Sequence, residues 1–202
     1  MWKCTNCHHV ELSTAKPELC PVCGAGADKL APHEIQAISG TKTLRNLKFG
    51  FIAESQAHLR NLAFAMNAEQ EGYSQMAILF RAIAEAEAVH AFNHLRLLGA
   101  VSGTQENLES AFERENLASN SYPQFVKDAN EEDNTYIATV FSYSRDVERG
   151  HAKLYKDALQ NMMAESQTKY YVCQVCGHVS DGVLPDECPI CGAPKEKFKM
   201  VV

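Results

Sequence analysis

Eight cysteines, all of them in Cys-x2-Cys pairs, constrain this chain more than any other feature of its sequence. Two pairs lie within the first 23 residues and two lie near the C-terminus, and in each region eleven or twelve residues separate the pairs. Two such pairs can place four thiolates tetrahedrally around one ion, so each end is predicted to be a Cys4 site for zinc or iron. Disulfides are the alternative, and they are disfavoured in a chain that starts without a secretory signal. The predicted ligands are Cys4, Cys7, Cys20 and Cys23 at one end and Cys173, Cys176, Cys188 and Cys191 at the other.

Composition narrows the class of protein. With 46% hydrophobic residues over 202 positions, the chain can bury a core of ordinary size. Its 19 basic and 25 acidic side chains give a net charge of −6, which repels nucleic acid and anionic lipid. No stretch approaches the roughly 20 apolar residues of a membrane span. We therefore expect a cytoplasmic protein with no nucleic-acid partner and no membrane partner.

The stretch between the cysteine clusters is rich in Ala, Leu, Glu and Gln, which is a helical composition. Gly72 interrupts it once, Gly99 and Gly103 close a second segment, and Pro123 lies in the path of a third. Four helices of this length predict a bundle. Their expected ranges are about 41–70, 73–98, a third from about Gln105, and a fourth that follows 129–134 and ends near Glu165.

Acidic and imidazole side chains fall on the stripe of each predicted helix that should be buried. A carboxylate that faces a core is costly unless a cation accompanies it. The glutamates occur in pairs 33 residues apart, and a histidine follows the second member of each pair in a Glu-x-x-His step. One Glu from each of two helices plus Glu-x-x-His from the other two is the di-iron or di-manganese constellation of ferritin-like bundles. The alternative is that these are solvated edge residues and ordinary core histidines. The predicted ligands are Glu54, Glu87, His90, Glu115, Glu148 and His151.

Nearly the whole chain resembles the rubrerythrin family. Residues 53–57 are similar to its first-helix ligand motif, and 71–75 leading to Glu87 and His90 match its second helix. Tyr122-Pro123 resembles its third-helix signature, and 173–198 resembles its rubredoxin-like tail. The resemblance implies an iron protein that reduces hydrogen peroxide or dioxygen with electrons passed from an Fe(Cys)4 centre to a di-iron centre.

The fold predicted on these grounds is mainly α: a ferritin-like four-helix bundle flanked by two small rubredoxin-like Cys4 modules. The expected domains are 1–34, 38–166 and 168–202. The expected cofactors are two iron ions in the bundle, iron in the C-terminal Cys4 site, and iron or zinc in the N-terminal one.

The chain departs from the family pattern on the third helix. Family members usually carry a second carboxylate three residues after the third-helix ligand, a position that is Ala118 here. An alignment anchored on Tyr122-Pro123 also shifts Glu115 out of place, whereas the 33-residue spacing favours it. The six ligands that remain are those of ferritin-type centres, so a ferroxidase is the alternative function. A non-enzymatic scaffold whose zinc ribbons bind a partner is a second alternative.

The two Cys4 modules differ in sequence, and most family members have only one. The C-terminal module has Gly177 and Gly192 directly after its two Cys-x2-Cys turns, which are called knuckles here. Glycine at these positions lets backbone N–H groups turn toward sulfur. The N-terminal module has His8 in the first of these positions. We therefore expect the C-terminal module to be the electron inlet, supplied by a reductase or a rubredoxin.

The expected mechanism gives each bundle residue a role. Glu54 and Glu115 cap one metal each, and Glu87 and Glu148 bridge the pair. His90 and His151 hold one metal each, with Tyr122 and Tyr155 as proton or hydrogen-bond donors. Peroxide would take up two electrons at this centre.

The short connection between the second and third helices predicts a homodimer with exchanged helical hairpins. The repeated ligand spacing relates the two hairpins by a pseudo-twofold axis, so these helices run parallel and the chain must return roughly 27 Å between them. The six residues from Gly99 to Thr104 reach roughly 20 Å even when extended. The connection is therefore too short for a bundle built within one chain.

Overall fold

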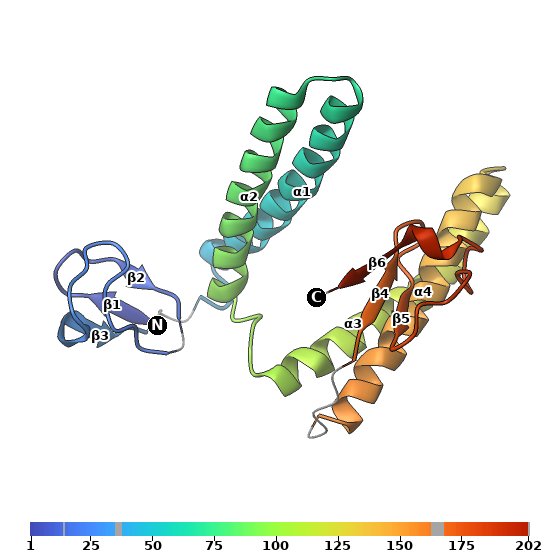
Figure 1. Cartoon of the computed structure of the whole chain (residues 1–202). Helices are drawn as coiled ribbons and strands as arrows, with labels where there is room; N and C mark the ends of the chain where they lie inside the picture. Colours follow the sequence, from blue (N-terminus) through green and yellow to red (C-terminus); the bar gives the residue numbers. More distant parts are fainter. Residues whose placement is uncertain (14, 35–37, 163–167, 202) are drawn as a thin grey trace. The chain divides into compact units, whose positions relative to one another are not determined.

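The computed structural model describes residues 1–13, 15–34, 38–162 and 168–201 (Figure 1). These residues form four long helices and two small three-stranded sheets. The chain divides into two compact units, Met1–Val101 and Ser102–Val202, and each unit holds one cysteine module and one pair of helices. Among the described residues, no helix is both long and apolar enough to cross a membrane.

The N-terminal module is a small sheet folded over its cysteines. Strand β1 pairs antiparallel with both neighbours in the order β2-β1-β3, so Trp2 lies opposite Glu11 on one side and Pro32 on the other. Cys4, Cys20 and Leu30 are its buried residues, and the sulfurs therefore take the place of an apolar core. Its elements are β1 (Trp2–Cys4), β2 (Val10–Glu11), the 3-10 helix η1 (Ala27–Lys29) and β3 (Leu30–Pro32).

The C-terminal module repeats this topology in the order β5-β4-β6. Cys173, Cys188 and Ala193 are buried, and Ile190 and Phe198 pack against them. Both modules are thus too small to be stabilised by buried apolar side chains alone. A metal ion bound by the four cysteines would supply the missing stability. The elements are β4 (Tyr170–Cys173), β5 (Val179–Asp181), the 3-10 helix η2 (Lys195–Lys197) and β6 (Phe198–Val201).

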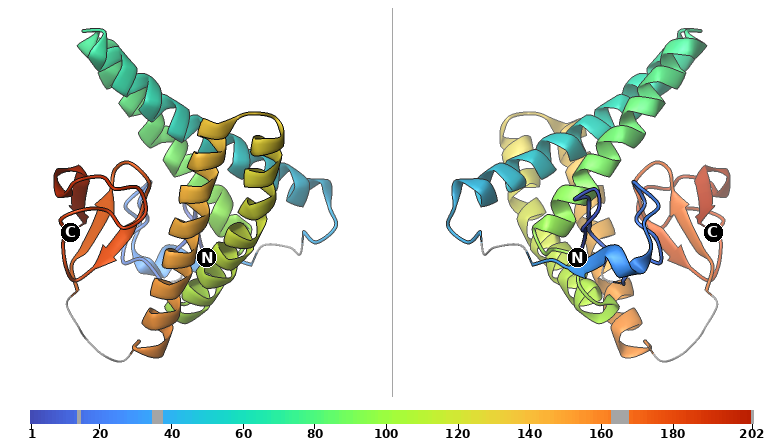
Figure 2. Two further views of the ribbon diagram at one scale, coloured as in Figure 1. Left: turned by 90° about the vertical axis from the view of Figure 1, so that its right-hand side faces the viewer. Right: turned by 90° about the vertical axis from the view of Figure 1, so that its left-hand side faces the viewer.

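The first helical hairpin consists of α1 (Lys42–Gln70) and α2 (Ser74–Leu97), which lie side by side in Figures 1 and 2. Thr41 caps α1, because its hydroxyl oxygen accepts a hydrogen bond from the Leu44 N–H at 3.2 Å. Gly72 makes the turn with φ +84°, a left-handed conformation that glycine adopts without a Cβ clash. The helices meet through small residues, which let the backbones approach closely; the buried ones are Ala65, Ala68, Ala77, Ala84 and Ala91.

The second hairpin consists of α3 (Thr104–Glu131) and α4 (Thr135–Gln160), which also pack side by side (Figure 2). Pro123 lies inside α3 without ending it, although its nitrogen cannot donate to the Ser119 carbonyl. Asp133 makes the turn with φ +59°. The predicted helix ranges agree with the structure to within a few residues, except that the expected end near Glu165 lies outside the described residues. The mainly α class with a Cys4 module at each end is confirmed.

The two hairpins repeat each other at an offset of 61 residues. The turn residues Gly72 and Asp133 correspond at this offset, and both have positive φ. The buried alanines also correspond: Ala68 with Ala129, Ala77 with Ala138, and Ala91 with Ala152. Residues 61 positions apart therefore have equivalent places in the packing of the two hairpins as well as in their ligand motifs. Each residue of one hairpin can be compared with its equivalent in the other.

Candidate metal centres

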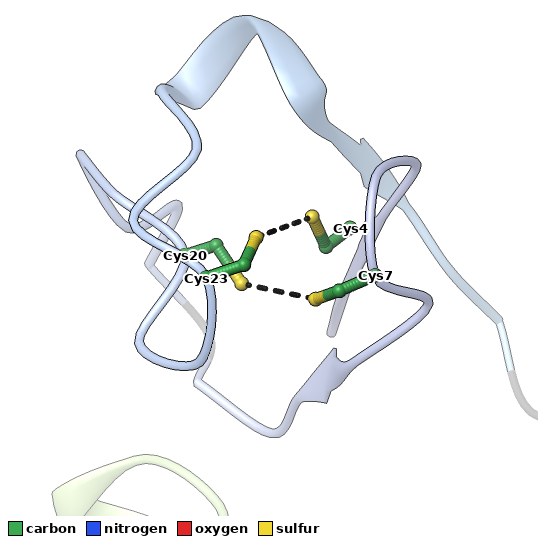
Figure 3. A group of neighbouring side chains, drawn as sticks. All are labelled: Cys4, Cys7, Cys20 and Cys23. Carbon is green, nitrogen blue, oxygen red and sulfur yellow. Dashed lines mark hydrogen bonds between the residues drawn. The ribbon is translucent and has the colours of Figure 1, made fainter.

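The four N-terminal cysteines converge from the two knuckle loops (Figure 3). The sulfurs of Cys4 and Cys23 lie 3.7 Å apart, and those of Cys7 and Cys20 lie 3.6 Å apart. A tetrahedron with metal–sulfur bonds of ~2.3 Å has edges of ~3.8 Å, so the sulfur spacing fits a tetrahedrally bound iron or zinc ion. The side-chain amide of Asn6 donates to the Cys23 sulfur at 3.5 Å and is the largest influence that lowers the pKa of Cys23, to about 6. A thiol with this pKa is deprotonated at neutral pH, as a metal ligand must be.

The first Cys-x2-Cys turn of the N-terminal module has the same backbone conformation as the first turn of the C-terminal module, although it is followed by His8 in place of glycine. His8 has φ +62°, and Gly177 at the equivalent position has φ +84°. The N–H of each donates to the carbonyl of the first cysteine of its knuckle, Cys4 or Cys173, at 2.9 Å. A side chain in this left-handed conformation costs about 1 kcal/mol. The N-terminal module therefore keeps the geometry at some cost in stability.

The C-terminal cysteines form the matching site. Cys173 and Cys191 sulfurs lie 3.8 Å apart, and Cys176 and Cys188 sulfurs lie 3.6 Å apart, which again fits a tetrahedral ion. Cys23 is the exposed member of the N-terminal set, whereas each C-terminal cysteine is buried or half-buried. The two sites thus offer the same ligands but differ in their access to solvent.

Three of the predicted bundle ligands gather on the first hairpin. Ligand atoms of Glu54, Glu87 and His90 all lie within 4.8 Å of one another. The Nδ1 of His90 lies 3.1 Å from a Glu87 oxygen, as the Glu-x-x-His step on one helical face requires. The Nδ1 of His58 lies 2.8 Å from the carbonyl oxygen of Ala84, which is one turn before Glu87. This imidazole therefore links α1 to α2 next to the ligands.

The equivalent three ligands gather on the second hairpin. Ligand atoms of Glu115, Glu148 and His151 lie within 4.8 Å of one another. His151 Nδ1 is 3.2 Å from Glu148 and 3.9 Å from Glu115. Burial, together with the hydrogen bond and negative charge of Glu148, raises the pKa of Glu115 to about 7. Carboxylates crowded in this way favour a bound cation, which would relieve their repulsion.

The register of α3 decides which glutamate joins this group. Two features of the sequence point to different registers for α3. Alignment with the family at Tyr122-Pro123 moves Glu115 away from the ligand position, whereas the 33-residue spacing of the glutamates places it there. Glu115 is the α3 residue that meets Glu148 and His151, whereas Glu113 is exposed. Ala118 lies one turn further along α3 and adds no ligand atom. The second hairpin therefore offers three ligands from these helices, as the first does.

A hydrogen bond connects the second ligand group to the C-terminal module. The Nε2 of His151 lies 3.2 Å from the Gly177 carbonyl oxygen, and Val147 on α4 would contact a Cβ at Gly177 at 3.8 Å. A carbonyl oxygen only accepts, so Nε2 donates to it, and Nδ1 is the ring nitrogen that faces the carboxylates. A histidine held in this way is oriented for a metal at Nδ1. Sequence reasoning missed this contact, because no spacing relates α4 to a loop 26 residues away.

Of the two predicted tyrosines, Tyr122 lines a different cavity from the ligands. Tyr122 packs with Phe125 and Phe141, with ring centroids 5.5 and 6.1 Å away, beside a cavity near the turn of the hairpin. Its role as a proton donor stays a prediction. A second cavity of about 420 Å³ borders the ligand group itself, and its lining includes Glu115, His151, Tyr155 and Tyr170. Tyr155 is thus the tyrosine better placed to serve a molecule bound at these ligands.

Comparison with known proteins covers nearly the whole chain. The family model described as "Rubrerythrin, rubredoxin-like domain" matches residues 2–30 and 171–199, and the model described as "Rubrerythrin" matches 45–106 and 106–175. Nigerythrin of Nitratidesulfovibrio vulgaris is 31% identical over 178 residues, which cover 77% of this chain and 85% of that protein. Rubrerythrin-2 of Clostridium acetobutylicum is 32% identical over 182 residues, covering 81% and 98%. A solved structure of nigerythrin in a mixed-valence state matches with a TM-score of 0.49 at 31% identity, covering 84% of this chain and 91% of that chain.

Proposed function

Since this chain belongs to the rubrerythrin family, and is as such a di-iron oxidoreductase with a rubredoxin-like centre, we propose that its substrate is hydrogen peroxide. Each peroxide takes up two electrons and two protons and leaves as two water molecules. The electrons come from a reductase or a rubredoxin and reach the bundle through the C-terminal Cys4 centre.

One observation carries this proposal: His151 belongs to two groups at once. Its Nδ1 faces the carboxylates of α3 and α4, and its Nε2 donates to the peptide carbonyl of Gly177, next to Cys176. The side chain is therefore a short hydrogen-bonded connection between the thiolate ligands and the carboxylate ligands of one unit. Such a connection can support electron transfer from one centre to the other within this unit.

The carboxylates fit a pair of iron ions, which when bound would supply the electrons and the Lewis acidity of the reaction. Glu87 and Glu148 are proposed to bridge the pair, with Glu54 and Glu115 as terminal ligands. The chain's own contribution is to orient these groups and to hold protons near them. The phenol of Tyr155 borders the same cavity as Glu115 and His151, so it can donate a proton to a leaving oxygen.

Anaerobic turnover with a reduced donor tests the substrate. Iron-loaded protein should consume one peroxide for each two electrons taken from the donor, and the absorption of the C-terminal Fe(Cys)4 centre should bleach and recover during turnover. Peroxide that disappears without oxidation of the donor would exclude this function. A protein whose Fe(Cys)4 centre stays reduced while peroxide is consumed would exclude the route through the C-terminal module.

Ala118 favours a second candidate, a ferroxidase. The ligand groups contain six residues, and the α3 position that carries a further carboxylate in most of the family is a methyl group here. A ferroxidase oxidises added Fe(II) with dioxygen or peroxide and needs no external electron donor. Consumption of oxidant in proportion to added Fe(II), with no acceleration by the donor, would establish this candidate in place of the first.

A further inference from the structure

The second Cys-x2-Cys turns of the two modules correspond residue by residue but differ in their exposure to solvent. Residues 168 positions apart match, so Cys20 and Cys23 in the N-terminal module correspond to Cys188 and Cys191 in the C-terminal one. Cys191 is half-buried, whereas Cys23 is exposed. A dissolved oxidant can therefore reach one sulfur of the N-terminal site more easily than its counterpart in the C-terminal site.

The residues around Cys23 account for this exposure. In the C-terminal module, Ile190 packs against the buried residues of the module. Its counterpart Val22 is 65% exposed. A Cβ added to Gly192 would meet the Glu187 carboxylate at 3.1 Å, whereas a Cβ added to Gly24 would meet no atom of the described residues within 4 Å. The space around the N-terminal turn is therefore open where the C-terminal turn has neighbours.

A second sulfur lies next to the exposed one. The Cys23 and Cys4 sulfurs are 3.7 Å apart, and Figure 3 shows them pointing toward each other. A disulfide has an S–S length of ~2.05 Å, so the two sulfurs would have to approach by about 1.7 Å. Cys4 is fully buried, so a dissolved oxidant reaches it less readily than it reaches Cys23. The pair thus combines an accessible thiolate with a shielded one that can react with it.

We propose that the N-terminal module is a thiol switch, in which hydrogen peroxide converts Cys23 and Cys4 to a disulfide and the module releases its metal ion. In the first step the Cys23 thiolate attacks a peroxide oxygen, so an S–O bond forms and the O–O bond breaks. The hydroxide that leaves takes up a proton and becomes water. In the second step the Cys4 thiolate attacks the Cys23 sulfur, so the S–S bond forms and the S–O bond breaks, and a second hydroxide leaves and is protonated.

The electrons and ligands balance without a change at the metal. The two thiolates lose two electrons, the peroxide gains them, and two protons are taken up to give two water molecules. The ion keeps its oxidation state but retains only Cys7 and Cys20 as ligands, so it dissociates. The buried residues of this module are two cysteines and Leu30, so loss of the ion should also unfold it. The C-terminal module should stay loaded under the same conditions.

This reaction is separate from the proposed function. It consumes one peroxide per chain, needs no electron donor and involves no residue of the bundle. Protein loaded only with zinc isolates it, because zinc does not exchange electrons and turnover at the bundle is then silent.

Zinc release and disulfide mapping test the switch on the full-length, zinc-loaded protein. Peroxide is added in increments, the zinc released above a peroxide-free blank is measured with a colorimetric chelator, and the cysteines are alkylated and mapped by mass spectrometry. One equivalent of peroxide should release one zinc per chain and form the Cys4–Cys23 disulfide, with the C-terminal cysteines still alkylated. Equal oxidation of both modules, a disulfide between other cysteines, or full retention of zinc would each overturn the proposal.

Exchanging the residues around the two turns tests whether exposure is the cause. Leu19→Glu with Val22→Ile gives the N-terminal turn the residues of the C-terminal one, and should slow its oxidation severalfold. Glu187→Leu with Ile190→Val is the matched reverse exchange, and should speed oxidation of the C-terminal module severalfold. Every cysteine ligand is kept in both variants. Faster oxidation in both would show that destabilisation and not exposure controls the reaction, and unchanged rates in both would likewise refute the role of exposure.

Discussion

Raising the pH should destabilise the metal-free protein through the Glu115 carboxylate. Burial and the neighbouring Glu148 raise the pKa of Glu115 to about 7, against an ordinary value of 4.5. A group whose pKa is higher in the folded state stabilises that state below the unfolded pKa, and this contribution disappears as the pH rises through the folded pKa. The window for this effect therefore runs from about pH 4.5 to somewhat above pH 7.

The size of the loss follows from the two pKa values. Between about pH 5 and pH 8 the linkage gives roughly 2.5 kcal/mol at 1.36 kcal/mol per pKa unit. Because the Glu115 side chain retains 22% exposure, solvent screening reduces this to about 2 kcal/mol in the free energy of unfolding. This loss corresponds to about a thirtyfold change in the folding equilibrium.

Urea unfolding followed by far-ultraviolet circular dichroism measures this difference on chelated protein. The free energy of unfolding should fall between pH 5 and pH 8 for the wild type, and Glu115→Gln should remove most of the fall. Glu54→Gln, at the equivalent position of the other hairpin, is the control and should retain it. Equal pH dependence in the wild type and Glu115→Gln would refute the reasoning. Iron-loaded protein should not lose stability in this range, since the ions neutralise the carboxylates.

Four further outcomes are expected. Glu87→Ala or Glu148→Ala should each lose the bundle metals and keep the metals of both Cys4 sites, and metal analysis that finds two bundle ions would contradict the bridging roles. Cys188→Ser should reduce donor-dependent peroxide turnover far more than Cys20→Ser, and equal losses would show that the modules do not differ as electron inlets. Gly177→Ala should destabilise the C-terminal module by about 1 kcal/mol, because φ +84° is unfavourable for alanine, and should speed its loss of iron to a chelator; an unchanged rate would contradict this. Chelation should lower the melting temperature of the whole protein, and an unchanged value would mean that the carboxylates are solvated.

Local chemistry allowed much of this protein to be predicted from its sequence. Cys-x2-Cys pairs form a compact turn whatever surrounds them, so the two tetrahedral sets of sulfurs could be predicted residue by residue. Helix ranges followed from composition and from glycine, with errors of a few residues. The Glu-x-x-His step places both side chains on one face of any α-helix, which is why Glu87 and His90 could be paired without a structure.

Contacts between distant segments required the tertiary structure. The competition between two alignments of α3 was decided by which glutamate meets Glu148 and His151, because a shift of one residue turns a side chain by about 100° around the helix. The hydrogen bond from His151 to the Gly177 carbonyl joins a side chain to a backbone group. Every residue has a backbone carbonyl, so the sequence does not indicate which one His151 contacts. The placement of Tyr122 with Phe125 and Phe141 likewise depends on packing between helices. Sequence determined which ligands this chain carries, because those depend on residues close together along it. Tertiary structure decided which groups they face, because that depends on how separate segments pack.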